Sequence, residues 1–246
     1  MHFFRTLISH ALPTACIVCA RHQKTMLCNF CYAFLEKHSL FHYPSCVRCG
    51  IQDEACATEP HQCSICLQQP PAFDQTHCLD RYDGVLQNAM HQLKYQRRLA
   101  ISDAFAYAWS RLALPHLNIS EEAVLLPVPL STQKLAHRGF NQSWEIAKRI
   151  QLPPGVQAIA NALGRHHSDS NQVERNRQDR QVALRHAFYI RPEMQSKIQN
   201  KSILVFDDVM TTGSTLHSIA TLLKDNGARS VMNWVVLRTL SPHAQT

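Results

Sequence analysis

The stretch Ile203-Leu-Val-Phe-Asp-Asp-Val-Met-Thr-Thr-Gly-Ser-Thr-Leu216 decides the fold of this chain. Residues 203–206 are apolar without alternation, which is typical of a strand covered on both faces, as in a parallel sheet. Two acids and a turn of small residues follow, and apolar residues then recur at helical spacing up to Gly227. A second apolar run, 231–237, predicts the next strand. The pattern indicates a strand–loop–helix–strand unit of an α/β protein, with its chemistry in the first loop.

The turn after the first strand has the composition of a phosphate-binding loop. Small residues around one glycine let backbone N–H groups point inward, and a helix N-terminus adds a favourable dipole. Asp207 and Asp208 fall at the carboxyl end of the strand, where they could hold sugar hydroxyls or a metal ion. A capped helix with solvated acids is the alternative, but the full run favours a site. The predicted loop residues are Thr211, Thr212, Gly213, Ser214 and Thr215.

Charge is distributed unevenly along the 246 residues, whose formal net charge is +7. Residues 1–78 hold five Lys/Arg and five Asp/Glu, so the positive excess lies after residue 78. This indicates an anionic partner, either a phosphorylated small molecule or nucleic acid, with a merely basic surface as the alternative. No run is long enough to span a membrane, and residues 1–13 are not typical of a secretory signal. We therefore expect a cytoplasmic protein.

Ten cysteines in a chain expected in the cytoplasm indicate bound metal rather than disulfides. Eight of them form four Cys-x-x-Cys pairs, each of which can aim two sulfurs at one tetrahedral ion, so two structural zinc ions are predicted. Sequential and interleaved pairing of the four knuckles both remain open. We interpret Cys56 and Cys78 as structural or incidental, and His61 as a surface residue rather than as a ligand that replaces a cysteine. The predicted ligands are Cys16, Cys19, Cys28, Cys31, Cys46, Cys49, Cys63 and Cys66.

The cysteine spacing and the linker Gln68-Gln69-Pro70-Pro71 predict two domains. Residues 1–70 would form a small double zinc-ribbon domain that depends on zinc for folding and serves as a scaffold or docking module. Residues 71–246 would form the parallel α/β domain, with helices on both faces of the sheet.

Three further segments of the second domain have candidate roles. A helix ending near Lys94, with Arg97 and Arg98 beyond it, either faces an anion or complements its own dipole. After an apolar strand broken by Pro127 and Pro129, the loop 131–142 carries Lys134, His137 and Arg138 and is a second candidate anion site. Residues 156–163 are predicted as another strand. The polar stretch 164–186, which includes Arg177 and Arg180, is predicted to be a lid.

In this order the parts of the chain resemble the ComF family of competence-type, amidophosphoribosyltransferase-like proteins. The resemblance covers nearly the whole chain. The strand, the paired acids and the turn resemble the phosphoribosyl pyrophosphate (PRPP) motif of type I phosphoribosyltransferases. The other shared features are the cysteine knuckles, Leu93-Lys94-Tyr95, Pro127-Val128-Pro129-Leu130, Arg138-Gly139-Phe140-Asn141-Gln142 and the Arg-rich lid; Ala183 stands where the family tends to have Asn.

The resemblance implies specific roles. Asp207 and Asp208 would hold the ribose hydroxyls of PRPP, residues 211–215 its 5′-phosphate, and Lys134 and Arg138 its diphosphate together with magnesium. Arg177 and Arg180 would close over the site and exclude water. The family implies a role in natural transformation, through handling of incoming single-stranded DNA.

The sequence leaves three functions open. The chain could be a PRPP-binding protein that handles DNA, an active transferase that moves phosphoribosyl to an amine or base with release of pyrophosphate, or a zinc-dependent adaptor that docks a DNA-uptake protein.

Overall fold

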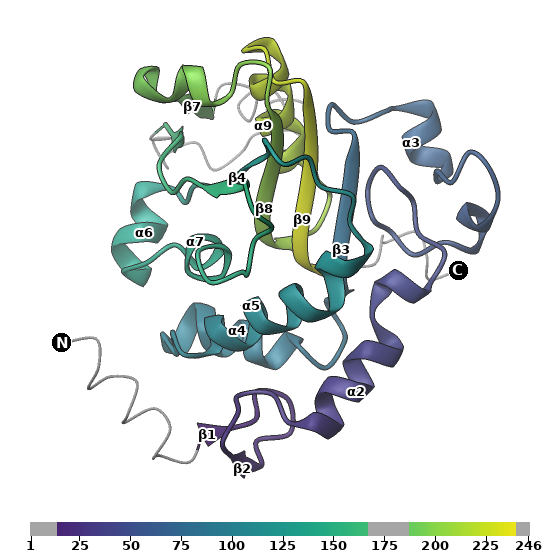
Figure 1. The fold of residues 1–246 in the computed structure, drawn as a ribbon, viewed down its shortest axis with the longest axis vertical. Coiled ribbons are helices and arrows are strands. Elements are labelled where there is room, and N and C mark those ends of the chain that lie inside the picture. Colours follow the sequence, from purple (N-terminus) through teal and green to yellow (C-terminus); the bar gives the residue numbers. More distant parts are fainter. Residues whose placement is uncertain (1–13, 167–186, 240–246) are drawn as a thin grey trace, which may run out of the picture.

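The computed structural model describes residues 14–166 and 187–239. Its centre is a five-stranded sheet with the strand order β3-β9-β8-β4-β5, in which every pairing is parallel (Figure 1). The strands are β3 (Gln75–Arg81), β4 (Val124–Pro127), β5 (Gln157–Ala158), β8 (Ser202–Met210) and β9 (Ser230–Arg238). The α/β parallel sheet predicted from the sequence is confirmed.

Helices cover both faces of this sheet because both faces are apolar. On one face, Phe206 and Trp234 pack in the same core as Trp109, whose ring lies 5.7 Å and 5.6 Å from theirs. On the other face, Val205 and Val235 pack against the helix that follows the predicted phosphate loop. The first face carries α4 (Gln87–Gln96), α5 (Ile101–Ala108) and α7 (Gln142–Ala147), and the second carries α9 (Ser214–Asp225).

Three segments differ from the sequence-based expectation. The expected loop 131–142 contains the helix α6 (Thr132–Arg138), because the hydroxyl of Ser131 caps it and Gly139, at φ +84°, ends it. The expected strand 156–163 is divided between β5 and β6 (Leu163–Arg165), because the chain turns at residues 160–161. β6 pairs antiparallel with β7 (Phe188–Ile190), so it lies outside the main sheet.

Short elements complete the connections. A π-helical turn, η3 (Trp109–Ala113), and a 3-10 turn, η4 (Leu114–His116), extend α5. Another 3-10 turn, η5 (Pro192–Lys197), leads into β8.

The later part of the cysteine-rich segment, around residues 44–68, lies beside the edge strand β3, and its first part, around residues 14–31, lies next to α4 and α5 (Figure 1). The segment has little regular structure, as expected for a segment that zinc would fold. Its elements are β1 (Thr14–Ala15), β2 (His22–Gln23), α2 (Asn29–His38), η1 (Leu40–His42), η2 (Glu54–Ala57) and α3 (Ser64–Gln68). Several of its residues, Leu35 among them, share a core with α4 and α5. The division into domains at residue 70 stays a prediction.

Candidate functional site

The paired acids lie inside β8 rather than in the loop after it. The sequence suggested that the strand ends at Phe206, but β8 stays paired with β9 as far as Met210. Because the ladder continues, Asp207 and Asp208 are fixed and buried, with 9% and 4% of their surfaces exposed. Two carboxyl groups on adjacent buried positions are costly unless something compensates their charge.

The carboxyl group of Asp207 is held by hydrogen bonds. Its Oδ1 accepts from the backbone N–H of Asp208 at 2.9 Å and from Oγ of Ser143 at 3.4 Å. Burial, together with the neighbouring Asp208 carboxylate, raises the pKa of Asp207 well above its usual range. The site therefore favours a ligand that brings hydrogen-bond donors or positive charge to this group.

Lys94 compensates the second carboxylate. Its Nζ, which comes from α4, lies 2.7 Å from Oδ2 of Asp208, and both side chains are largely buried. Oδ1 of Asp208 accepts from the N–H of Val209 at 2.8 Å. The sequence suggested an anion or the helix dipole as the partner of Lys94, and the structure instead pairs it with one of the acids. No local spacing could have indicated this contact, because the two residues lie on different elements.

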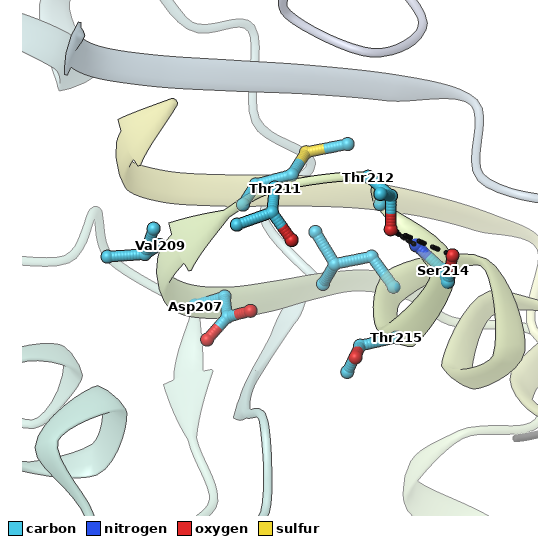
Figure 2. Close-up of a pocket in the computed structure, with 9 residues that line it drawn as sticks. Asp207, Val209, Thr211, Thr212, Ser214 and Thr215 are labelled. Atoms are coloured by element: carbon cyan, nitrogen blue, oxygen red, sulfur yellow. Dashed lines mark hydrogen bonds between the residues drawn. The ribbon is translucent and has the colours of Figure 1, made fainter. Parts of the chain in front are cut away.

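The predicted phosphate loop surrounds a small hollow of about 40 Å³ at the end of β8. Figure 2 shows Asp207, Thr211 and Thr215 around it, with Thr212 and Ser214 at the helix end. The hydroxyls of Thr212 and Ser214 lie 2.9 Å apart. Gly213 has φ +80°, a left-handed conformation that other residues adopt only with strain, so the turn favours glycine. The structure therefore brings residues 211–215 together around one opening.

The basic residues of α6 lie beyond β4, the strand beside β8. Lys134 is exposed. Arg138 hydrogen-bonds Oε1 of Gln142 and lies over the ring of Tyr95, with 5.8 Å between its Cζ and the ring centre. Because α6 follows a strand that is parallel to β8, it lies at the same carboxyl edge of the sheet as the paired acids.

One residue of the site was missed by the sequence analysis. Ser143 is 1% exposed and follows the run 138–142 that the family shares. The side chain of Asn141 caps α7 by accepting from the N–H of Ser143 at 3.0 Å, and its amide donates to the carbonyl of Val128 at 2.9 Å. This local fold aims the hydroxyl of Ser143 at Asp207. The predicted lid residues Arg177 and Arg180 lie outside the described residues.

The eight predicted metal ligands gather into two groups of four. The groups follow chain order, so the pairing is sequential rather than interleaved, and all sulfurs in a group lie within 4.8 Å of one another. The groups are Cys16, Cys19, Cys28 and Cys31, called the first cluster below, and Cys46, Cys49, Cys63 and Cys66, called the second cluster.

The spacing of the sulfurs fits zinc. Sulfurs at about 2.3 Å from a tetrahedral ion are about 3.8 Å apart. The Sγ atoms of Cys19 and Cys28 are separated by 3.8 Å, and so are those of Cys49 and Cys63. Nδ1 of His61 lies 2.9 Å from the carbonyl of Cys56, and Nε2 lies 3.2 Å from Glu59, so both ring nitrogens face groups other than a metal cluster.

Comparison with known proteins identifies the family. The chain is 32% identical over 203 residues to the DNA utilization protein YhgH of Shigella flexneri, covering 79% of this chain and 84% of YhgH. It is 25% identical over 218 residues to Competence protein F of Haemophilus influenzae, covering 87% and 91%. The chain belongs to the ComF family.

A second comparison supports the fold of this ComF-family chain. Residues 145–243 match the model of the phosphoribosyl transferase domain. One solved structure with a similar region is the allosteric regulatory enzyme of purine biosynthesis, at 17% identity and a TM-score of 0.36 over 55% of this chain and 26% of that one. Among the described residues, the structure contains no helix that could span a membrane.

Proposed function

We propose that this chain binds PRPP at the carboxyl end of β8 and acts in the handling of single-stranded DNA. PRPP binding is supported by the two buried acids, Asp207 and Asp208, which lie beside an open glycine turn at the start of α9. The 5′-phosphate would bind to the N–H groups and hydroxyls of 211–215. The ribose hydroxyls would donate to Asp207 and Asp208, which supplies the donors that a buried carboxyl group requires.

The diphosphate of PRPP would lie toward Lys134 and Arg138. Magnesium, which prefers carboxylate and phosphate oxygens, would neutralise part of the diphosphate charge when it is bound. Lys94 already offsets the charge of Asp208, so we expect this acid to contact a ribose hydroxyl rather than to be a primary metal ligand. Arg177 and Arg180 stay candidates for closing the site.

Titration calorimetry with PRPP and magnesium tests this site. Asp207→Asn and Asp208→Asn keep the side-chain shape but replace an acceptor oxygen with an NH2 donor. Each should weaken PRPP binding by roughly tenfold or more, because a ribose hydroxyl loses its hydrogen-bond acceptor. Asp225→Asn, at the exposed far end of α9, is the matched control and should bind as the wild type does. Unchanged affinity in both site variants would refute the assignment.

The DNA role rests on the names of the relatives and on one exposed surface. Nη2 of Arg97 donates to the carbonyl of His137 at 2.6 Å, which joins the end of α4 to α6. Tyr95 is 64% exposed on this surface. Sites that bind single-stranded nucleic acid typically combine cations along the path of the nucleic-acid backbone with an exposed aromatic ring on which a base can stack. The residues of this α4–α6 face are Tyr95, Arg97, Arg98, Lys134, His137 and Arg138.

Single-strand binding measured over a range of salt concentrations tests the α4–α6 face. Arg98→Ala should lower the salt slope by about 0.7, as expected for one lost phosphate contact. Tyr95→Ala should cost about 1–3 kcal/mol through lost base stacking. Lys148→Ala, on the exposed end of α7, is the control for charge alone. If all three variants behave alike, the DNA site lies elsewhere.

The phosphoribosyl transferase match favours catalysis as a second candidate. The bond from C1 of the ribose to the diphosphate would break as a bond from C1 to an acceptor nitrogen forms. Pyrophosphate release in the presence of amines or bases would support transfer, and PRPP binding without release would support a binding protein.

The third candidate, a docking module, is supported by apolar side chains on the cysteine-rich segment. Phe30 is 76% exposed, and Ile65 and Leu67 are each 54% exposed. Loss of a co-purifying DNA-uptake protein after Phe30→Ser would support docking.

The proposed function also includes a cytoplasmic location for the protein, where PRPP is made.

A further inference from the structure

Arg238, the last residue of β9, connects the second cluster to the phosphate loop. It is 6% exposed, although it is an arginine at the end of a strand. Its Nε donates to the backbone carbonyl of Cys49 at 2.9 Å. Its Nη1 donates to the carbonyls of Met210 at 3.2 Å, of Thr211 and of Thr239 at 2.8 Å. One guanidinium group therefore holds a metal knuckle and the first residue of the loop together.

The position of Arg238 follows from the sheet register. Met210 and Arg238 are the last paired residues of β8 and β9. The N–H of Thr239 still donates to the carbonyl of Met210 at 3.1 Å, but the carbonyls of Thr211 and Thr239 lie beyond the last ladder pair and accept from Arg238. Carbonyls left unpaired are costly. The rigid fork of a guanidinium, with five N–H groups, can satisfy several carbonyls at once, which a lysine ammonium cannot do with the same geometry.

The knuckle that Arg238 contacts is itself fixed to the sheet edge. The N–H of Thr76, on β3, donates to the carbonyl of Val47 at 3.0 Å. Nη1 of Arg48 donates to the carbonyl of Phe73 at 2.9 Å. Gly50 has φ +67°, and a Cβ there would approach Sγ of Cys78 to 2.7 Å. The knuckle between Cys46 and Cys49 therefore packs as an extension of the sheet.

We propose that Arg238 is a positioning residue that couples the second cluster to the phosphate loop, so that metal binding and PRPP binding strengthen each other. Zinc on Cys46 and Cys49 would fix the Cys49 carbonyl, and through Arg238 it would fix the carbonyls at the start of the loop. A ligand that orders the loop must then raise the zinc affinity of the second cluster by the same factor, because coupling between two binding sites is reciprocal. The inference rests on the proposed PRPP site.

Arg238→Lys tests this coupling while it keeps the positive charge. We expect PRPP to bind about 5- to 30-fold more weakly than to the wild type, with two zinc ions per chain still present. Cys63→Ser, which removes a ligand of the second cluster, should weaken PRPP binding to a similar extent. The double variant should bind no more weakly than either single variant, because both act through one connection.

Equilibrium competition for zinc by a chelator supplies a readout that a merely structural arginine would not change. Cys19→Ser leaves one zinc ion, in the second cluster, and saturating PRPP should raise its affinity about 5- to 30-fold. Arg238→Lys in that background should abolish this gain. In Cys63→Ser, which keeps the zinc of the first cluster, PRPP should leave the zinc affinity unchanged. Equal gains in both clusters, or a gain that survives in Arg238→Lys, would overturn the proposal.

Amide hydrogen exchange keeps the test decisive if a variant fails to fold or PRPP does not bind. In the folded wild type, zinc removal by limiting chelator should raise exchange in 210–213 in step with exchange in 46–66. Exchange in 210–213 that stays constant while the second cluster loses its metal would contradict the coupling. Absence of PRPP binding to the wild type would instead refute the proposed function and leave this measurement valid.

Discussion

Each of the two cysteine clusters consists of two Cys-x-x-Cys knuckles, but the clusters are attached to the rest of the molecule differently. In the first cluster, Cys28 and Cys31 lie in the apolar core that also contains Met90 and Phe105. The second cluster is joined to the sheet edge by backbone hydrogen bonds and by Arg238. Apolar packing is non-directional, whereas a hydrogen-bonded connection fixes atomic positions. We therefore expect the first cluster to serve stability and the second to serve the geometry of the site.

Cys31→Ser should have the largest effect on stability. Cys31 is 4% exposed, and its loss would remove a ligand of the first cluster and leave a hydroxyl in the shared core. Because zinc contributes about 10–16 kcal/mol to small metal domains, we expect a loss of at least about 4 kcal/mol in the free energy of unfolding. Urea unfolding followed by tryptophan fluorescence measures it. The PRPP affinity of the protein that remains folded should stay close to that of the wild type, and a large loss of affinity would remove the distinction between the clusters.

Gly50→Ala should have an intermediate effect, in the second cluster. Residue 50 has a positive φ, and the added Cβ would approach Sγ of Cys78 to 2.7 Å. We therefore expect a loss of about 2–3 kcal/mol in the free energy of unfolding, together with weaker PRPP binding. Gly139→Ala is the matched control, because φ is +84° there but nothing lies within 4 Å of the added Cβ. It should cost about 1 kcal/mol. Equal costs, measured by urea unfolding, would show that the knuckle is not tightly packed against β3.

Asp80→Asn should have the smallest effect and should stabilise the protein. Asp80 lies at the end of β3, in a cavity of about 410 Å³ lined by Phe34 and His38 from α2 and by Gln52 beyond the second cluster's first knuckle. Burial raises the pKa of Asp80 to about 6. The folded state therefore binds this proton more tightly than the unfolded state, and stability falls as the pH rises from about 4 to 6.

The expected gain from Asp80→Asn is about 1–3 kcal/mol at pH 7.5, because the variant removes a buried charge. The gain should vanish near pH 3, below the ordinary pKa of 3.8, where the wild-type carboxyl group is largely protonated in both states. Unfolding curves at the two pH values measure this difference. A gain that is equal at both pH values would show that ionisation of Asp80 is not its cause.

Local patterns predicted the fold and which residues gather at the candidate site, while contacts between distant elements were not predictable. The apolar run 203–206, the turn at Gly213 and the cysteine spacing each report on a few neighbouring residues, so sheet, loop and ligand sets followed from sequence. The pairing of Lys94 with Asp208, the hydrogen bond from Ser143 to Asp207 and the position of Arg238 depend on packing between elements. The end of β8 was also predicted too early in the sequence. Asp207 and Asp208 have low strand propensity, but pairing with β9 keeps them in the strand.

A crystal structure of the protein with PRPP and magnesium tests the central claim most directly. The account predicts the 5′-phosphate against the backbone of 211–215, with the ribose hydroxyls within hydrogen-bond distance of Asp207 and Asp208. PRPP bound with its 5′-phosphate and ribose away from residues 207–215, and with the turn at Gly213 empty, would contradict it.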